Sequence, residues 1–161
     1  MSDSGFSTNK SVVVPIIVSV ATSFLATRFI ELPVQRQLRD ESRKQDVRAD
    51  ANAVAFKYAQ AIWNYWHGRK HVEPKEAMQE YRNQLQRATE EAASISVRLE
   101  DLYEDKTIVQ DWRQMMQSFH DAHFPLGQGG MVDEVTMQHD VVSAMSLADS
   151  AIARMRDEVR R

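Results

Sequence analysis

The chain has 161 residues, of which 43% are hydrophobic and 27% are charged, and its formal net charge is -3. Lys and Arg alternate with Asp and Glu along the chain, so no one-sided basic face is offered to phosphates, which argues against a nucleic-acid-binding protein. The absence of cysteine excludes a disulfide framework, a thiolate metal site and a cysteine nucleophile.

Residues 12–32 form the most apolar segment of the sequence. No residue is charged from Val12 to Ala26, and the apolar character resumes at Phe29, after Arg28. A helix over Val12–Ile30 would rise roughly 28 Å, about the thickness of the hydrocarbon core of a bilayer. We therefore predict a transmembrane helix over 12–32 that lies in the lipid bilayer.

Two other interpretations of this segment fit the sequence less well. A cleaved signal peptide would need a basic start and small residues before the cut site, and the sequence provides neither. A buried core helix would be apolar on every side, unlike the other helices predicted below. The retained anchor is the interpretation that fits the sequence best.

The basic residues beside the predicted span indicate its orientation. Only Lys10 precedes it, whereas the following stretch contains Arg36, Arg39, Arg43, Lys44 and Arg48. The positive-inside rule then predicts an extracytoplasmic tail over 1–11 and a cytoplasmic C-terminal domain. The expected localisation is a single-pass membrane protein with its N-terminus outside.

Small hydroxyl residues recur every four positions within the span, at Ser19, Ser23 and Thr27. This spacing allows close approach of another helix, so these residues are candidates for helix association in the membrane. Alternatively, the same hydroxyls bond to the carbonyl four residues earlier in their own helix. Self-association through the span and the segment after it, giving a homo-oligomer, is therefore an expectation.

Residues 33–46 are rich in charge, with Leu38 as the main apolar residue, and predict a solvated helical stalk. An amphipathic helix then begins at Val47 and is expected to stop near Gly68. Its predicted core stripe comprises Val47, Ala51, Val54, Tyr58, Ile62 and Tyr65.

Three further amphipathic helices follow. The first starts at Pro74 and has a seam with a period of 3.5 residues, which requires a partner helix alongside. The seam comprises Met78, Tyr81, Leu85, Ala88, Ala92, Ile95, Leu99 and Leu102. The next helix starts around Asp105 and ends at "HFPLGQGG". Its inner side comprises Ile108, Val109, Trp112, Met115, Met116 and Phe119. The last begins near Asp133, with an inner side of Val135, Met137, Val141, Ala144, Met145, Ala148, Ile152, Met155 and Val159.

No run alternates in the manner of a strand, so the predicted fold class is all-α. Four amphipathic helices with short connections fold most simply into an antiparallel, up-down-up-down four-helix bundle over 47–161. This arrangement brings the first and third connections to one end of the bundle, the end farther from the predicted membrane helix.

That end is expected to hold the histidines His67, His71, His120, His123 and His139. The pairs His67/His71 and His120/His123 have the spacings of one helical face, so these five are candidates for a metal site or a pH-responsive patch. Neither pair has the Glu of an H-E-x-x-H motif, and exposed histidines without a ligand are the simpler expectation. We accordingly predict no metal and no cofactor.

Aromatic residues concentrate in the same region, and Trp63, Trp66 and Phe124 are candidate partner-binding residues. As core side chains, they need no function at all. No nucleophile elbow, catalytic triad or paired-carboxylate pattern is present, so no catalytic residue and no enzymatic activity is predicted.

The expected function is that of a non-catalytic adaptor, accessory or regulatory subunit at the membrane, where the bundle binds a protein partner or joins a larger membrane complex. The alternative is a membrane-tethered sensory bundle that responds to metal or pH through its histidine-rich end.

Overall fold

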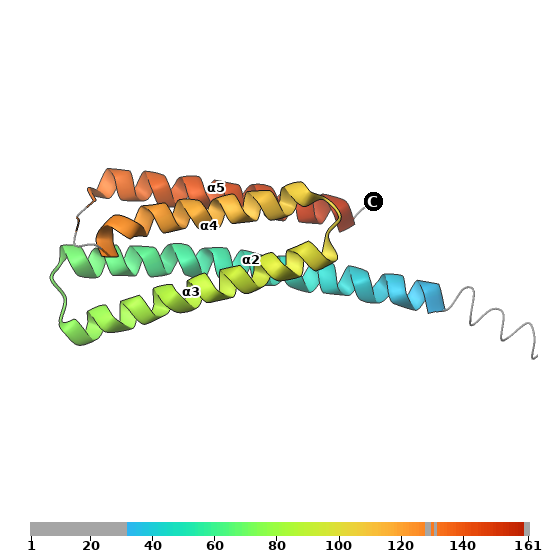
Figure 1. Ribbon diagram of the computed structural model, residues 1–161, viewed down its shortest axis with the longest axis horizontal. Coiled ribbons are helices and arrows are strands. Elements are labelled where there is room, and N and C mark those ends of the chain that lie inside the picture. Colours follow the sequence, from blue (N-terminus) through green and yellow to red (C-terminus); the bar gives the residue numbers. More distant parts are fainter. Residues whose placement is uncertain (1–31, 128–129, 131, 160–161) are drawn as a thin grey trace, which may run out of the picture. The chain divides into compact units, whose positions relative to one another are not determined.

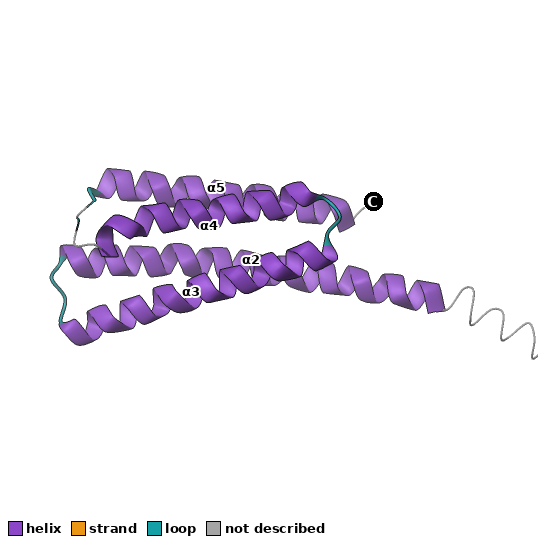
Figure 2. Cartoon of the chain, viewed as in Figure 1, coloured by secondary structure: helices purple, strands orange, loops and turns teal. Residues whose placement is uncertain are grey.

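The computed structural model describes residues 32–127, 130 and 132–159. These residues form four helices: α2 (Leu32–Lys70), α3 (Lys75–Leu102), α4 (Lys106–Gly127) and α5 (Glu134–Val159). No strand occurs among the described residues, as Figure 2 shows. The prediction of an all-α fold is therefore confirmed.

The chain divides into two compact units, residues 1–40 and residues 41–161. In the first unit the structure describes residues 32–40, which are helical and solvent-exposed, including Leu32, Val34 and Leu38. The predicted transmembrane helix over 12–32 lies outside the described residues apart from Leu32, and so do Ser19, Ser23 and Thr27. Among the helices that are described, none combines the length and the apolar character needed to cross a bilayer.

The second unit is a bundle in which the four helices lie side by side and alternate in direction along the chain (Figure 1). Ion pairs join neighbouring helices around it. Lys57 Nζ lies 3.0 Å from Glu91 Oε2 between α2 and α3, and Arg154 Nε lies 3.0 Å from Asp111 Oδ2 between α5 and α4. Lys70 Nζ lies 2.6 Å from Glu134 Oε2, which places the end of α2 beside the start of α5.

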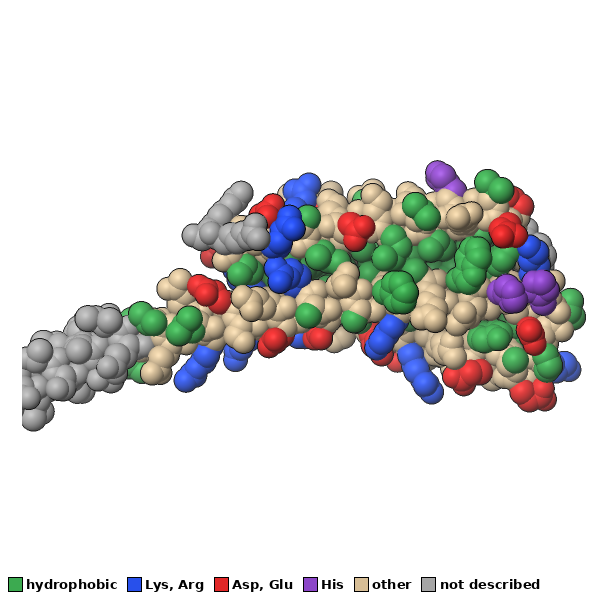
Figure 3. All heavy atoms as spheres, turned by 180° about the vertical axis from the view of Figure 1, so that it is seen from behind, with side chains coloured by type: hydrophobic (Ala, Val, Ile, Leu, Met, Phe, Trp, Pro, Cys, Tyr) green, Lys and Arg blue, Asp and Glu red, His purple; other side chains and the backbone are tan. Residues whose placement is uncertain are grey.

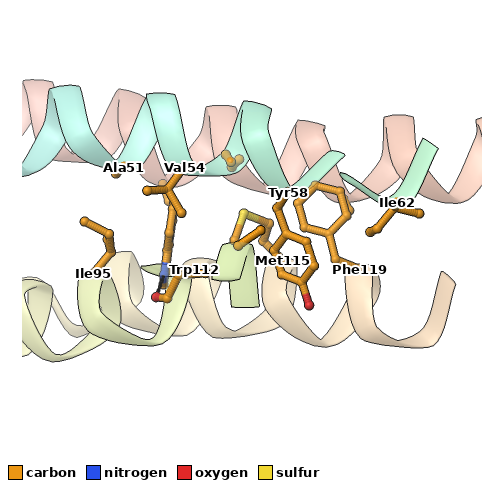
Figure 4. Close-up of a cluster of buried hydrophobic side chains, with 14 of the residues drawn as sticks. Ala51, Val54, Tyr58, Ile62, Ile95, Trp112, Met115 and Phe119 are labelled. Atoms are coloured by element: carbon orange, nitrogen blue, oxygen red, sulfur yellow. Dashed lines mark hydrogen bonds between the residues drawn. The ribbon is translucent and has the colours of Figure 1, made fainter. Parts of the chain in front are cut away.

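The interior follows the stripes that periodicity predicts. All six predicted core residues of α2 are buried, and so are the middle positions of the α3 seam, from Leu85 to Leu99. Figure 4 shows Tyr58 of α2 against Met115 and Phe119 of α4; the rings of Tyr58 and Phe119 have centroids 4.8 Å apart. The indole N–H of the fully buried Trp112 donates to the carbonyl oxygen of Ala92, 3.0 Å away, and so ties α4 to α3.

α2 ends close to the expected position, but Gly68 is not the residue that ends it. The helix continues two residues past Gly68 to Lys70, and Gly68 is itself buried. A Cβ at Gly68 would lie 2.7 Å from the Tyr81 ring and 2.9 Å from Met78 Sδ. The glycine is thus needed for the close approach of the first turns of α3 and not for ending the helix.

The helix actually ends in a Schellman motif centred on Val72. The N–H of Glu73 donates to the Gly68 carbonyl at 3.0 Å, and the N–H of Val72 donates to the Arg69 carbonyl at 3.4 Å. Val72 has a φ of 52°, the left-handed conformation for which glycine is the usual residue, and its side chain is 87% exposed. A β-branched side chain in this conformation stores backbone strain.

Replacing Val72 by Gly is therefore expected to stabilise the bundle. The left-handed conformation costs an ordinary residue about 1–2 kcal/mol, and the greater freedom of glycine in the unfolded chain offsets about half of this, leaving a net gain of about 0.5–1 kcal/mol. Val142, which is 61% exposed in α5, provides the control, because Val142→Gly should destabilise by about 0.5 kcal/mol. Urea unfolding curves of the two variants should thus move in opposite directions, and a shift of both to lower urea would contradict the strain at Val72.

Two other details at the α4–α5 connection correct the prediction. α4 ends within the predicted segment "HFPLGQGG", at Gly127, but not at its proline, because Pro125 lies inside the helix and the following Leu126 is fully buried in the core. The N–H of Gly130 donates to the Pro125 carbonyl at 2.9 Å and so closes the helix end. Val135 was expected to point inward, but it is 76% exposed.

At the opposite end of the bundle, Glu158 of α5 accepts three hydrogen bonds. Its carboxylate lies 2.9 Å from Lys44 Nζ and 3.1 Å from each of the backbone nitrogens of Glu104 and Asp105. Burial alone would raise the pKa of Glu158, but these bonds outweigh it, so the pKa of this carboxyl lies below its ordinary value of 4.5. We call this group of contacts the Glu158 clamp; it joins α2, the α3–α4 turn and α5.

Candidate interaction surface at the tip of the bundle

One end of the bundle carries both predicted histidine pairs, and we call this end the tip. It is the end of the bundle where α2 and α4 finish and where α3 and α5 begin (Figure 1). Figure 3 shows histidine side chains at this end among apolar and charged ones.

His67 and His71 form the first histidine pair, with ring centroids 4.2 Å apart at the end of α2. Lys70 lies between them in sequence, and its ammonium group pairs with Glu134 and lies 4.7 Å from the centroid of the Trp66 ring. The hydrogen bond from Lys70 is the largest cause that lowers the pKa of Glu134, and the charges of Lys70, His67 and His71 add to it. The Lys70–Glu134 pair thus lies where the end of α2 meets the start of α5.

His120 and His123 form the second pair, near the end of α4, with ring centroids 5.1 Å apart. His123 Nδ1 lies 2.7 Å from the Phe119 carbonyl oxygen. Burial lowers the pKa of His123, and the neighbouring His120 lowers it further, while the bond to Phe119 acts in the opposite direction. The side chain of His123 is therefore predominantly neutral at physiological pH.

His139 stands apart from both pairs in its contacts, since its Nδ1 lies 3.3 Å from Asp140 Oδ1 on the exposed side of α5. The described residues contain no group of three or more His, Cys, Asp or Glu that could hold a metal ion. The five candidate histidines are thus distributed over two pairs and one further residue.

The three candidate partner-binding aromatics differ in exposure. Trp66 is only 2% exposed, and its indole N–H donates to the Val132 carbonyl oxygen at 2.9 Å. Trp63 is partly buried against the core, with its ring 5.1 Å from that of Trp66. Phe124 is 50% exposed, and the centroid of its ring lies 5.5 Å from that of the His120 ring. Only Phe124 and part of Trp63 are thus accessible to a partner.

Sequence reasoning overlooked two exposed apolar residues at the tip. Val72 lies in the α2–α3 turn, and Val135 lies in the first turn of α5 next to Glu134. The exposure of Val135 has a sequence signal, because it precedes Met137 by two residues and so lies about 200° around the helix from that buried residue. Val72 is exposed because it stands in the turn.

Sequence reasoning also missed a groove between α3 and α4. Two hollows of about 280 and 510 Å³ share Thr89, and their floor is formed by Tyr65 and Tyr58 of α2. The hydroxyl oxygens of Tyr58 and Thr89 lie 3.1 Å apart, and burial raises the pKa of Tyr58. The α3 wall includes Ala93 and Ser96, so small side chains beside the predicted seam were the available signal.

Comparison with protein-family models, with curated proteins and with solved structures found no match to this chain.

Proposed function

We propose that the protein is a non-catalytic membrane-anchored adaptor, accessory or regulatory subunit that binds a partner protein through the tip of its bundle. In this proposal residues 12–32 anchor the chain in a membrane with the N-terminus outside. Residues 33–46 form the stalk, and the bundle after it faces the cytoplasm.

The observation that carries the proposal is the exposure of large apolar side chains on three segments of the tip. Val72 is 87% exposed, Val135 is 76% exposed and Phe124 is 50% exposed, although the core beneath them is filled by Trp66, Leu126 and Met137. Exposed apolar side chains from several segments at one end of a domain are typical of a protein-binding surface.

The charges around these residues support a specific contact. Lys70 precedes Val72 by two residues and Glu134 directly precedes Val135, and both side chains of this ion pair are about half exposed. An apolar contact bordered by such a pair resembles the anatomy of protein interfaces, where apolar anchors are surrounded by a polar rim.

The proposal is tested by purifying the tagged full-length chain from its native membranes in mild detergent and identifying the proteins that accompany it. We expect a partner in defined stoichiometry with the wild type. Phe124→Ala and Val135→Asp should reduce its recovery about tenfold, the change that corresponds to losing one moderate contact.

Val97→Asp provides the matched control, since Val97 is a 61% exposed valine near the end of α3, at the opposite end of the bundle from the tip. It should leave recovery of the partner unchanged, and all three variants should melt near the wild-type temperature. Equal recovery with the tip variants and the control would refute binding through the tip.

A further inference from the structure

The outward face of α2 has a second periodic pattern in addition to its core stripe. Its members follow one another in regular steps of three and four: Ser42, Gln45, Ala49, Asn52, Phe56, Ala59 and Trp63. All are exposed except Ala59 and Trp63, which are partly buried. We call this set the α2 seam. A strictly alternating three-and-four pattern is the geometry by which two helices pack side by side.

The α2 seam contains no charged residue, although α2 is rich in charge. Every charged residue between Ser42 and Trp63 lies at another position: Arg43, Lys44, Asp46, Arg48, Asp50 and Lys57. Several of these side chains are directed to neighbouring helices. Lys57 and Asp50 pair with Glu91 and Arg98 of α3, and Lys44 pairs with Glu158 of α5. The α2 seam is thus uncharged; its members from Ser42 to Phe56 are exposed, whereas Ala59 and Trp63 pack against the edge of the core.

The seam also includes one exposed aromatic side chain, Phe56, that the core does not use. Phe56 is 65% exposed, whereas Tyr58 two residues later is 1% exposed. Figure 3 shows apolar side chains continuing from α2 toward α5 on this side of the bundle. Exposed aromatic residues on an uncharged face favour a protein contact over solvent.

We propose that the α2 seam is a dimer interface that binds the same seam of a second copy of this chain in a parallel coiled-coil contact. The charge distribution favours a second copy as the occupant. A face that meets its own copy places each residue near its equivalent, so any charge on the face would oppose a like charge, and the α2 seam carries none. The small residues Ser42, Ala49 and Ala59 allow the two helices to approach closely.

The polar seam residues favour the parallel orientation. In a parallel pair Asn52 meets Asn52 of the partner subunit, and Gln45 meets its own equivalent, so that the amides can bond to each other across the interface. In antiparallel packing the positions that face Asn52 are Ser42, Ala49 or Phe56. The same spacing continues in the sequence to Leu38, four residues before Ser42, which would lengthen the contact.

Because the chain has no cysteine, single cysteines report the contact directly in the full-length protein purified in mild detergent. A parallel interface brings equivalent seam positions to the Cα separation of 4.4–6.8 Å that a disulfide requires. Ala49→Cys and Asn52→Cys should therefore form covalent dimers under mild oxidation. Gln114→Cys, on the exposed side of α4, should not.

A charge variant gives an independent test. Asn52→Glu places two carboxylates opposite each other and should weaken dimerisation about tenfold or more, as measured by light scattering over a concentration series. Gln114→Glu adds the same charge on α4 and should leave dimerisation unchanged. Circular dichroism melting checks that both variants remain folded, which is expected because both positions are exposed.

The inference does not depend on the proposed partner at the tip. If dimerisation fails in Asn52→Glu while partner capture through Phe124 persists, the two surfaces are separate. A monomeric wild-type chain, or cross-linking of Gln114→Cys as efficient as that of Asn52→Cys, would overturn the proposed seam contact. Cross-linking confined to a single seam position would overturn the parallel orientation.

Discussion

Replacing Phe119 by Ala is expected to lower the free energy of unfolding by about 3–5 kcal/mol, whereas replacing Phe56 by Ala should change it by less than about 0.5 kcal/mol. The two residues share the same side chain and lie on long helices of one bundle, but Phe119 is fully buried and Phe56 is 65% exposed. Removal of the Phe119 ring leaves a cavity beside Tyr58, whose ring lies 4.8 Å away, centroid to centroid.

Urea unfolding at a concentration where the chain is monomeric measures both changes. The low concentration separates the stability of the fold from any contribution of the α2 seam to dimerisation. A similar loss for both variants would mean that Phe56 packs inside the domain and would remove the outward face on which the seam rests. A negligible loss for Phe119→Ala would contradict the position of the core between α2 and α4 (Figure 4).

The second large effect is expected at the Glu158 clamp, where Glu158→Gln should destabilise the bundle by about 1–3 kcal/mol at neutral pH. The carboxylate is 15% exposed and accepts bonds from Lys44 and from two backbone N–H groups of the α3–α4 turn. A neutral amide retains one acceptor oxygen and loses the charge, so Lys44 is left without its anion and one N–H without its acceptor.

The same clamp predicts the direction of the pH dependence. Because the pKa of Glu158 is lower in the folded chain than its ordinary value of 4.5, its stabilisation is complete above that value. The stabilisation is lost as the pH falls through the folded-state pKa, since the unfolded chain then binds more protons. The difference in stability between wild type and Glu158→Gln should therefore be constant near neutrality and shrink below about pH 4.5.

Glu91→Gln is the control for this prediction. Glu91 also pairs with a lysine, Lys57, but the two side chains are 45% and 60% exposed, and such pairs contribute only about 0–1 kcal/mol. A loss in Glu91→Gln equal to that in Glu158→Gln would show that the three converging bonds at Glu158 add nothing beyond an ordinary surface pair.

Helical periodicity correctly predicted which residues are buried wherever a helix packs through a single apolar face. The seam of α3 and the inner side of α4 repeat at helical spacing, and the structure buries Leu85, Ile95, Trp112 and Phe119 as expected. The start of α5 was also predictable, because Asp133 accepts hydrogen bonds from the N–H and the hydroxyl of Thr136 at the helix start. Such signals are local, so they do not depend on how the helices meet.

The predictions failed where another helix decided the role of a residue. Gly68 looks like a helix stop in the sequence, yet its lack of a side chain accommodates Tyr81 of α3. Pro125 looks like the end of α4, yet the burial of Leu126 extends the helix past it. Val135 is an error of another kind: it precedes the buried Met137 by two residues, which places it about 200° around the helix from Met137, and it is exposed.

For the candidate surfaces, the sequence predicted where the residues lie but not which of them are exposed. Helical spacing and the short connections were sufficient to place the histidines and Phe124 at one end of an all-α bundle, because helix length and direction follow from local pattern. Only the tertiary structure decided which of these side chains remain accessible. Trp66 can be buried because the Val132 carbonyl accepts the hydrogen bond of its indole N–H. The groove at Thr89 is present because α3 and α4 leave space between them. The α2 seam is accessible because the buried residues of α2 lie on the opposite side of that helix. Exposure depends on contacts between segments far apart in the chain, and no local pattern encodes those contacts.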